Sequence, residues 1–215
     1  LVGFLGLAPA QASARVHVVE TFTTAISGLN HLFHGNVDFK LFFRLLIPGM
    51  IGGVTGAYLL THIDGAVVKP FVLAYLVGIG LWLLVRGILY PPKIMKPKLV
   101  EPLGLIGGFL DAAGGGGWGP VVTSNLLVQG AEPRKVVGTV NSVEFFLTLT
   151  ISAAFISQLG FADVAGATLG LLIGGVIAAP FGAIMAKRMS PKVMLILVGI
   201  VLSITSAWSL YRTLG

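Results

Sequence analysis

Cysteine is absent from this chain of 215 residues, and charged residues make up only 10% of it. The lack of cysteine excludes a disulfide-stabilised scaffold, thiolate metal sites and cysteine nucleophiles. Soluble domains carry about 25% charged residues, so this chain has too few charges to cover a water-soluble globule of its size. Hydrophobic residues reach 55%, and there are 30 glycines. The composition therefore predicts an all-α integral membrane protein with closely packed helices.

Six stretches are long and apolar enough to cross a bilayer. A spanning helix needs about 20 mostly apolar residues, because the hydrocarbon layer is roughly 30 Å thick. The predicted spans are residues 16–37, 41–62, 66–90, 136–162, 164–186 and 193–211. The net charge of +6 fits basic loops of a membrane protein and does not indicate a nucleic-acid partner.

Residues 102–129 differ from the predicted spans on either side. A short apolar run ends at Asp111, four consecutive glycines follow at 114–117, and Pro120 precedes a second short run. Each half would be roughly 15–20 Å long as a helix, which is too short to cross. Consecutive glycines interrupt a helix, and proline suits the first turn of the next one. We therefore expect a broken, re-entrant helix pair whose loop lies inside protein or beside a water-filled cavity.

The chain also repeats itself weakly. A shift of 124 positions places Val16, Glu20 and Thr24 on Val140, Glu144 and Thr148. This alignment predicts a first repeat at 1–98 and a second at 99–215, each with a broken helix and three spans. The first-repeat partner of the glycine loop would precede residue 1, so we expect the first repeat to lack its N-terminal part.

Basic loop residues lie on opposite sides of the two predicted repeats. In the second repeat, basic residues lie at 134–135 and 187–192, on one side of its spans. In the first repeat, most basic residues lie at 40–44 and 86–98, which the repeat alignment places on the other side. By the positive-inside rule the two repeats are inverted, an organisation typical of secondary transporters.

Two sets of polar residues stand at helical spacing within predicted spans. Glu144 has Asn141 and Thr148 on the same face, and His17, Glu20 and Thr24 occupy the matching positions of the first repeat. Polar groups at this depth are costly, so they indicate a polar pathway in which Glu20 and Glu144 take up protons. The alternative is that these groups bind one another and hold the helices together.

The glycine loop has two interpretations. Its backbone amides, at the positive end of the following half-helix, form a site for an anion, which Thr123 and Ser124 extend by a turn. The alternative is close helix packing, which glycine also permits. Asp111 is expected to cap or brace the loop, because its charge would repel an anion.

Other functions are weaker alternatives. His31 and His34, together with His17 and Glu20, suggest a divalent metal-cation carrier if the two pairs converge. A non-transporting membrane assembly partner would instead have a tightly packed glycine loop without a cavity. The glycine run lacks the lysine of a phosphate-binding loop, and no hydrolase arrangement is present, so we expect neither an enzyme nor a bound cofactor.

The segment LDAAGGGGWGP at 110–120, followed by VVTSNLL, GTVN at 138–141 and Glu144, resembles the sulfite exporter TauE/SafE family, also called toluene-sulfonate uptake permeases. The first-repeat stretch at 14–20 resembles the same family. This resemblance implies a multi-pass carrier of the bacterial inner membrane that moves sulfite, organosulfonates or related sulfur-containing anions, coupled to protons. The sequence leaves both a monomer and a homodimer open.

The expected site combines the loop with the polar positions of the two spans. The substrate-binding residues are expected to be Gly114, Gly115, Gly116, Gly117, Trp118, Gly119, Thr123, Ser124, Asn141 and His17, with Glu20 and Glu144 for proton coupling or gating.

Overall fold

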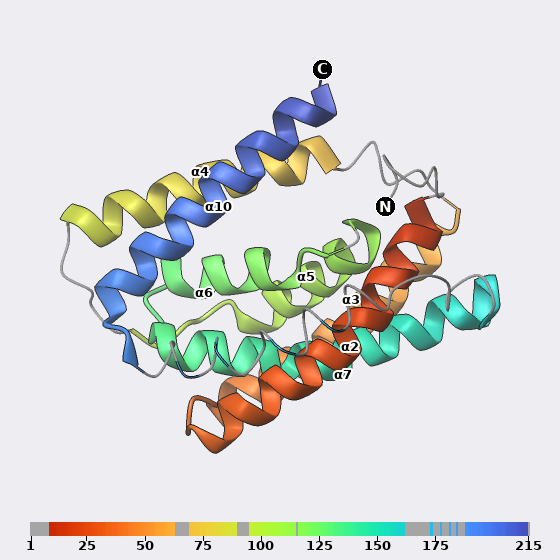
Figure 1. Cartoon of the computed structure of the whole chain (residues 1–215), viewed down its shortest axis with the longest axis horizontal. Coiled ribbons are helices and arrows are strands. Elements are labelled where there is room, and N and C mark those ends of the chain that lie inside the picture. The colour runs from red at the N-terminus through yellow and green to blue at the C-terminus, as the bar shows by residue number, and fades with distance from the viewer. Residues whose placement is uncertain are drawn as a thin grey trace.

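The computed structural model describes residues 9–62, 69–89, 95–114, 116–161 and 188–214, with single positions at 173, 177, 181 and 184. All regular elements in these ranges are helical (Figure 1). They are α2 (Pro9–Phe33), α3 (Phe39–Leu60), α4 (Lys69–Leu89), α5 (Val100–Gly114), the π-helical turn η1 (Gly119–Thr123), α6 (Ser124–Val128), α7 (Pro133–Leu159) and α10 (Pro191–Leu214). The predicted all-α class is confirmed.

Three of the described helices are long and apolar enough to cross a membrane, namely Phe39–Leu60, Pro133–Leu159 and Lys192–Leu214. They coincide with the predicted spans 41–62, 136–162 and 193–211. Helix α2 overlaps the predicted span 16–37 and α4 lies within the predicted span 66–90, but neither is among these three helices. The predicted span 164–186 lies outside the described residues apart from single positions.

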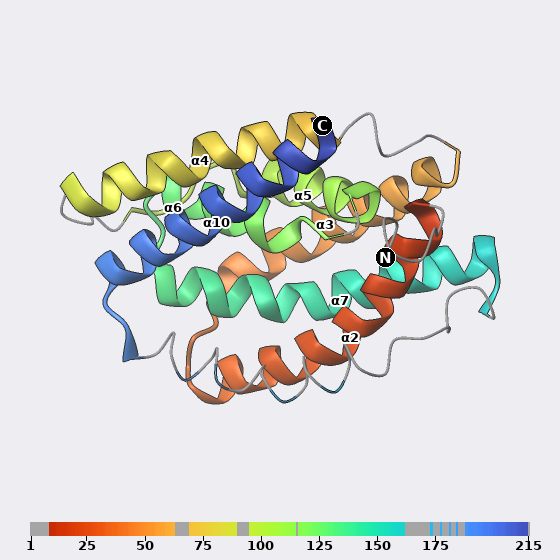
Figure 2. The same cartoon turned by 45° about the horizontal axis from the view of Figure 1, so that its top comes forward.

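The helices form two groups with the broken helix between them. Helices α4 and α10 run side by side, and α2, α3 and α7 lie on the opposite side of α5, η1 and α6 (Figures 1 and 2). The predicted broken helix is therefore flanked on two sides by helices that come from both halves of the chain.

Glycines allow α3 and α5 to cross with their backbones in direct contact. A Cβ atom placed on Gly52 would lie 2.9 Å from the carbonyl carbon of Leu105, and one placed on Gly108 would lie 2.9 Å from that of Gly49. Lipid-embedded helices gain little from burying apolar side chains against each other, so small residues that permit such an approach determine where they cross. This contact fixes α5, the first half of the broken helix, against a spanning helix.

Helices α2 and α7 cross in antiparallel directions. Early in α2, the ring of His17 lies 6.2 Å from that of Phe155, late in α7. Late in α2, the Ser27 hydroxyl donates to Asn141 Oδ1 over 3.0 Å, early in α7. The two helices that the repeat alignment pairs therefore run in opposite directions.

Candidate functional site

The broken helix turns at the predicted glycines. Helix α5 ends at Gly114 and η1 begins at Gly119, with Gly115 outside the described residues. Gly116 has a φ of 114°, a left-handed conformation that side chains rarely adopt. The amide of Gly116 donates to the backbone carbonyl of Asp111 over 3.1 Å and closes the end of α5. The predicted interruption between two half-helices is confirmed.

The carboxylate of Asp111 binds the amides that follow this turn. Its Oδ1 accepts hydrogen bonds from the backbone N–H groups of Gly117 and Trp118, over 2.6 and 2.7 Å. The side chain is buried, with 1% of its surface exposed. The prediction that Asp111 braces the loop is confirmed. A substrate anion would have to displace this carboxylate to reach these two amides.

The other oxygen of Asp111 faces His17 of α2, which is fully buried. The Nδ1 atom of His17 lies 2.8 Å from the backbone carbonyl of Ser13. A carbonyl only accepts hydrogen bonds, so Nδ1 carries a proton. The Nε2 atom lies 3.2 Å from Asp111 Oδ2, and one further proton must lie between these two atoms for a hydrogen bond to form. Both ring nitrogens of His17, expected to bind substrate, thus have protein partners.

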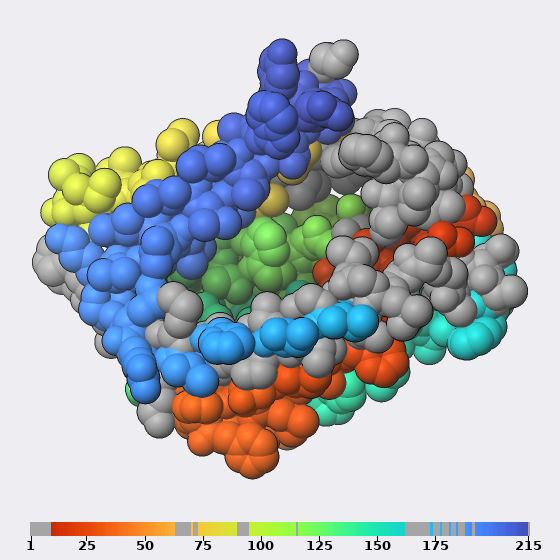
Figure 3. Space-filling model, viewed as in Figure 1, coloured from red at the N-terminus to blue at the C-terminus, as the bar shows by residue number. Residues whose placement is uncertain are grey.

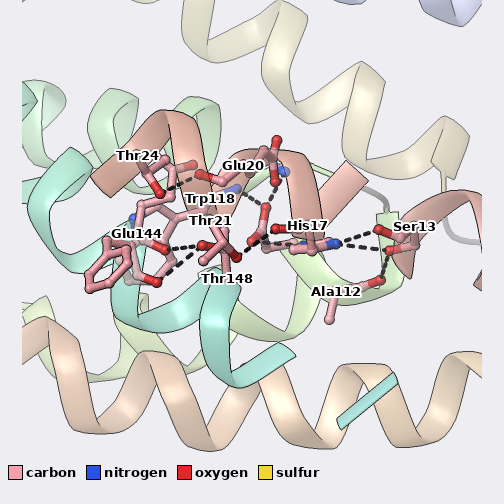
Figure 4. Close-up of polar contacts among 12 residues, drawn as sticks. Ser13, His17, Glu20, Thr21, Thr24, Ala112, Trp118, Glu144 and Thr148 are labelled. Carbon is pink, nitrogen blue, oxygen red and sulfur yellow. Dashed lines mark hydrogen bonds and ion pairs between the residues drawn. The ribbon is translucent and has the colours of Figure 1, made fainter. Parts of the chain in front are cut away.

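Ser13 adds a second connection between α2 and α5, and sequence analysis missed it. Its hydroxyl donates to the backbone carbonyl of Ala112 over 2.8 Å (Figure 4). Its position, four residues before His17, was the available signal, because residues at this spacing share one helix face. Ser13 and His17 together attach α2 to the end of α5 next to the glycine loop.

Both predicted proton-coupling residues approach the loop. An oxygen of Glu20 lies 3.5 Å from the position a Cβ would take on Gly116, and an oxygen of Glu144 lies 4.0 Å from that on Gly119. Glu20 Oε2 is buried and has no hydrogen-bond partner among the described residues. The two carboxylates come from α2 and α7 and border one loop.

The surroundings of the two glutamates match. The Thr24 hydroxyl donates to the backbone carbonyl of Glu20 over 2.5 Å, and the Thr148 hydroxyl donates to that of Glu144 over 2.8 Å (Figure 4). These are the pairs that the repeat alignment places on one another.

A hollow of about 380 Å³ adjoins the start of the second half-helix. Gly119, Pro120 and Thr123 line it, together with Val137 of α7 and five residues of α10. In the space-filling view, residues of the broken helix are visible at the bottom of a depression beside α10 (Figure 3). Of the residues expected to bind substrate, Gly119 and Thr123 therefore border open space.

Three other expected residues contact protein groups instead. Trp118 and Ser124 are fully buried. The Trp118 indole donates to the carbonyl of Val140 over 3.1 Å, and the Ser124 hydroxyl donates to the carbonyl of Val121 in η1 over 3.2 Å. Asn141 accepts from Ser27 and donates to the carbonyl of Val137 over 3.0 Å. Trp118 therefore packs inside the protein, and Asn141 joins α2 to α7.

The histidines do not converge as a metal carrier requires. His17 and His31 stand 14 positions apart on α2, which is about 21 Å along a helix. His31 Nδ1 accepts a hydrogen bond from the Asn36 amide over 3.1 Å. Within the described ranges, no three His, Cys, Asp or Glu side chains form a group suited to a metal ion.

Comparison with known proteins identifies the family. The model of the sulfite exporter TauE/SafE family matches residues 1–209. The chain belongs to this family. This TauE/SafE member is also 44% identical over 203 residues to the probable membrane transporter protein YtnM of Bacillus subtilis strain 168, in an alignment that covers 90% of the chain and 68% of YtnM. No solved structure matches significantly. Together with the spanning helices, these matches indicate a membrane transporter and not an enzyme.

Proposed function

We propose that this protein is a multi-pass secondary transporter of the bacterial inner membrane that moves sulfite, an organosulfonate or a related sulfur-containing anion together with protons. One observation carries the proposal. Glu20 and Glu144, from two helices of opposite direction, border the same glycine loop, and a hollow adjoins it. Family membership supports the class of substrate.

Electrostatics connects the two glutamates to proton coupling. An ionised carboxylate about 4 Å from a bound anion repels it by about 4 kcal/mol at an effective dielectric constant of about 20. A proton on the carboxylate removes this repulsion and turns the group into a hydrogen-bond donor. An anion at the loop is therefore bound best when Glu20 and Glu144 are protonated, so anion and protons travel together.

The antiparallel arrangement of α2 and α7 supports inverted repeats at 1–98 and 99–215. In such transporters the substrate site lies near the midplane, and one repeat rocks against the other during alternating access. The Ser27–Asn141 hydrogen bond joins α2 and α7. In this proposal, the relative motion of the two helices moves Glu20 and Glu144 with respect to the loop.

Uptake of a labelled organosulfonate into proteoliposomes tests the proposal. A sulfonate stays ionised near neutral pH, so any dependence of uptake on pH reports on the protein and not on the substrate. We expect uptake against a concentration gradient when the outer solution is acidic, and loss of this accumulation when a protonophore is added. Sulfite and inorganic phosphate serve as comparison substrates.

Variants assign the coupling to particular residues. With Glu20→Gln or Glu144→Gln, which imitate protonated side chains, exchange of labelled for unlabelled sulfonate should persist while accumulation driven by the pH gradient is lost. Glu132→Gln is the matched control, because Glu132 lies outside the loop and pairs with Arg134 over 3.6 Å. The proposal is wrong if the glutamine variants accumulate sulfonate as the wild type does, or if wild type moves no sulfur anion.

A further inference from the structure

A second hollow, of about 400 Å³, lies at the end of the bundle where α3 and α7 begin. Four basic residues line it, namely Lys40, Arg44, Lys96 and Lys135. They come from both predicted repeats and from three separate segments of the chain. Folding therefore brings basic residues that are scattered in the sequence together at this end of the bundle.

The two acidic residues that line this basic hollow already have partners. Asp38 Oδ1 accepts from the backbone amides of Lys40 and Leu41, over 2.9 and 3.2 Å, and so caps α3. Glu132 pairs with Arg134. The acidic side chains of the hollow are thus engaged in capping and pairing, and its four basic residues outnumber its two carboxylates.

The basic groups retain the capacity to bind an anion. Lys135 donates to the carbonyls of Gly35 and Val37, over 2.8 and 3.3 Å. One of the three N–H groups of its ammonium therefore remains available to an anion. Lys40 and Lys96 are exposed, and within the described ranges neither takes part in a salt bridge. Arg44 is paired with Glu101 over 2.6 Å, so the three lysines provide the binding capacity.

An apolar stripe leads away from this hollow along α3. Phe39, Phe43, Ile47 and Ile51 are each more than half exposed, and their spacing of four places them on one helix face. The stripe extends about 18 Å along the helix axis, which matches the length of an acyl chain. Gly49 and Gly52 lie in the same stretch of α3 but contact α5 instead.

We propose that the basic hollow binds the phosphate headgroup of an anionic phospholipid, with an acyl chain along the Phe39–Ile51 stripe. Basic pockets between helices on the cytoplasmic side attract anionic headgroups. The apolar stripe, which begins beside the cationic hollow, favours a lipid over a free anion. Because α3 holds α5 through its glycines, this lipid stabilises the helix that supports the glycine loop.

Binding to the purified protein in a neutral detergent tests this proposal. Short-chain phosphatidylglycerol should raise the unfolding temperature more than phosphatidylcholine with the same chains. Removing two lysine charges with Lys40→Ala/Lys96→Ala should weaken phosphatidylglycerol binding by about 30-fold, which corresponds to about 2 kcal/mol. Lys98→Ala is the matched control, because Lys98 lies in the same segment but does not line the hollow.

Two further results decide the outcome. The unfolding temperature in phosphatidylcholine shows whether the double variant is folded, and the two exposed lysines should leave it unchanged. Equal effects of phosphatidylglycerol on wild type and on a folded double variant would overturn the proposal. Stabilisation by glycerol phosphate or a free sulfonate equal to that by phosphatidylglycerol would also overturn it, because the hollow would then bind soluble oxyanions.

Discussion

Because the backbones of α3 and α5 touch where the helices cross, we expect a single added methyl group at the crossing to push α5 away from α3. In Gly108→Ala, the new Cβ would lie 2.9 Å from the carbonyl carbon of Gly49 and closer still to its oxygen. Ordinary contact begins at 3.4 Å, so the two backbones must move apart by at least 0.5 Å, the difference between these distances. No flexible side chain can yield here, because Gly49 presents backbone atoms.

The expected loss of stability follows from two opposing effects. Overpacking costs up to about 3 kcal/mol, and alanine favours a helix over glycine by about 1 kcal/mol. The net loss of about 2 kcal/mol corresponds to a Tm that is lower by about 4–8 °C in a chain of this size. Displacement of α5 should also slow sulfonate uptake, since α5 carries Asp111 to the loop.

In a matched control substitution, we expect the Tm to stay the same or to rise. Gly78 lies within α4, and a Cβ there would meet nothing within 4 Å. Gly78→Ala should therefore leave the Tm unchanged or raise it by no more than about 4 °C. Thermal unfolding of the detergent-solubilised variants measures both effects. If Gly108→Ala unfolds at the wild-type temperature or above it, the inferred direct backbone contact does not exist.

Five other substitutions, at four positions, test the loop and the α2–α7 connection. Gly116→Ala should lower the Tm because its φ of 114° is left-handed, whereas Gly114→Ala, with open space around its Cβ, should not; equal effects would argue against the turn. Asp111→Ala leaves two amides and the Nε2 atom of buried His17 without a partner, and the loss should approach about 3–5 kcal/mol in thermal unfolding. Asp111→Asn retains an acceptor and should lose clearly less, and an equal loss would contradict the capping role. Ser27→Ala removes the bond to Asn141 and should cost about 0.6 kcal/mol, whereas a loss as large as that of Asp111→Ala would mean that this bond does more than join α2 to α7.

The break in the helix could be predicted from the sequence, because it depends on local chemistry. Four glycines and a following proline interrupt a helix whatever surrounds them, and the structure ends α5 at Gly114 and resumes at Gly119. The same holds for the faces of α2 and α7, where helical spacing alone places Glu20 with Thr24 and Glu144 with Thr148. Features set by periodicity or by backbone freedom were thus accessible without coordinates.

The partners of the loop amides could not be predicted, because they depend on the fold. The sequence suggests that Asp111 braces the loop, but only the structure shows that its two oxygens bind different elements, the amides of Gly117 and Trp118 on one side and His17 on the other. His17 lies 94 positions away from Asp111, and no local pattern links them. The Asp111 carboxylate already accepts hydrogen bonds from two amides at the positive end of a half-helix. A substrate anion that approaches these amides must therefore compete with a carboxylate that is part of the protein. A substrate that binds at the loop must therefore either displace Asp111 or use the neighbouring surface of Gly119 and Thr123, which borders the hollow beside α10.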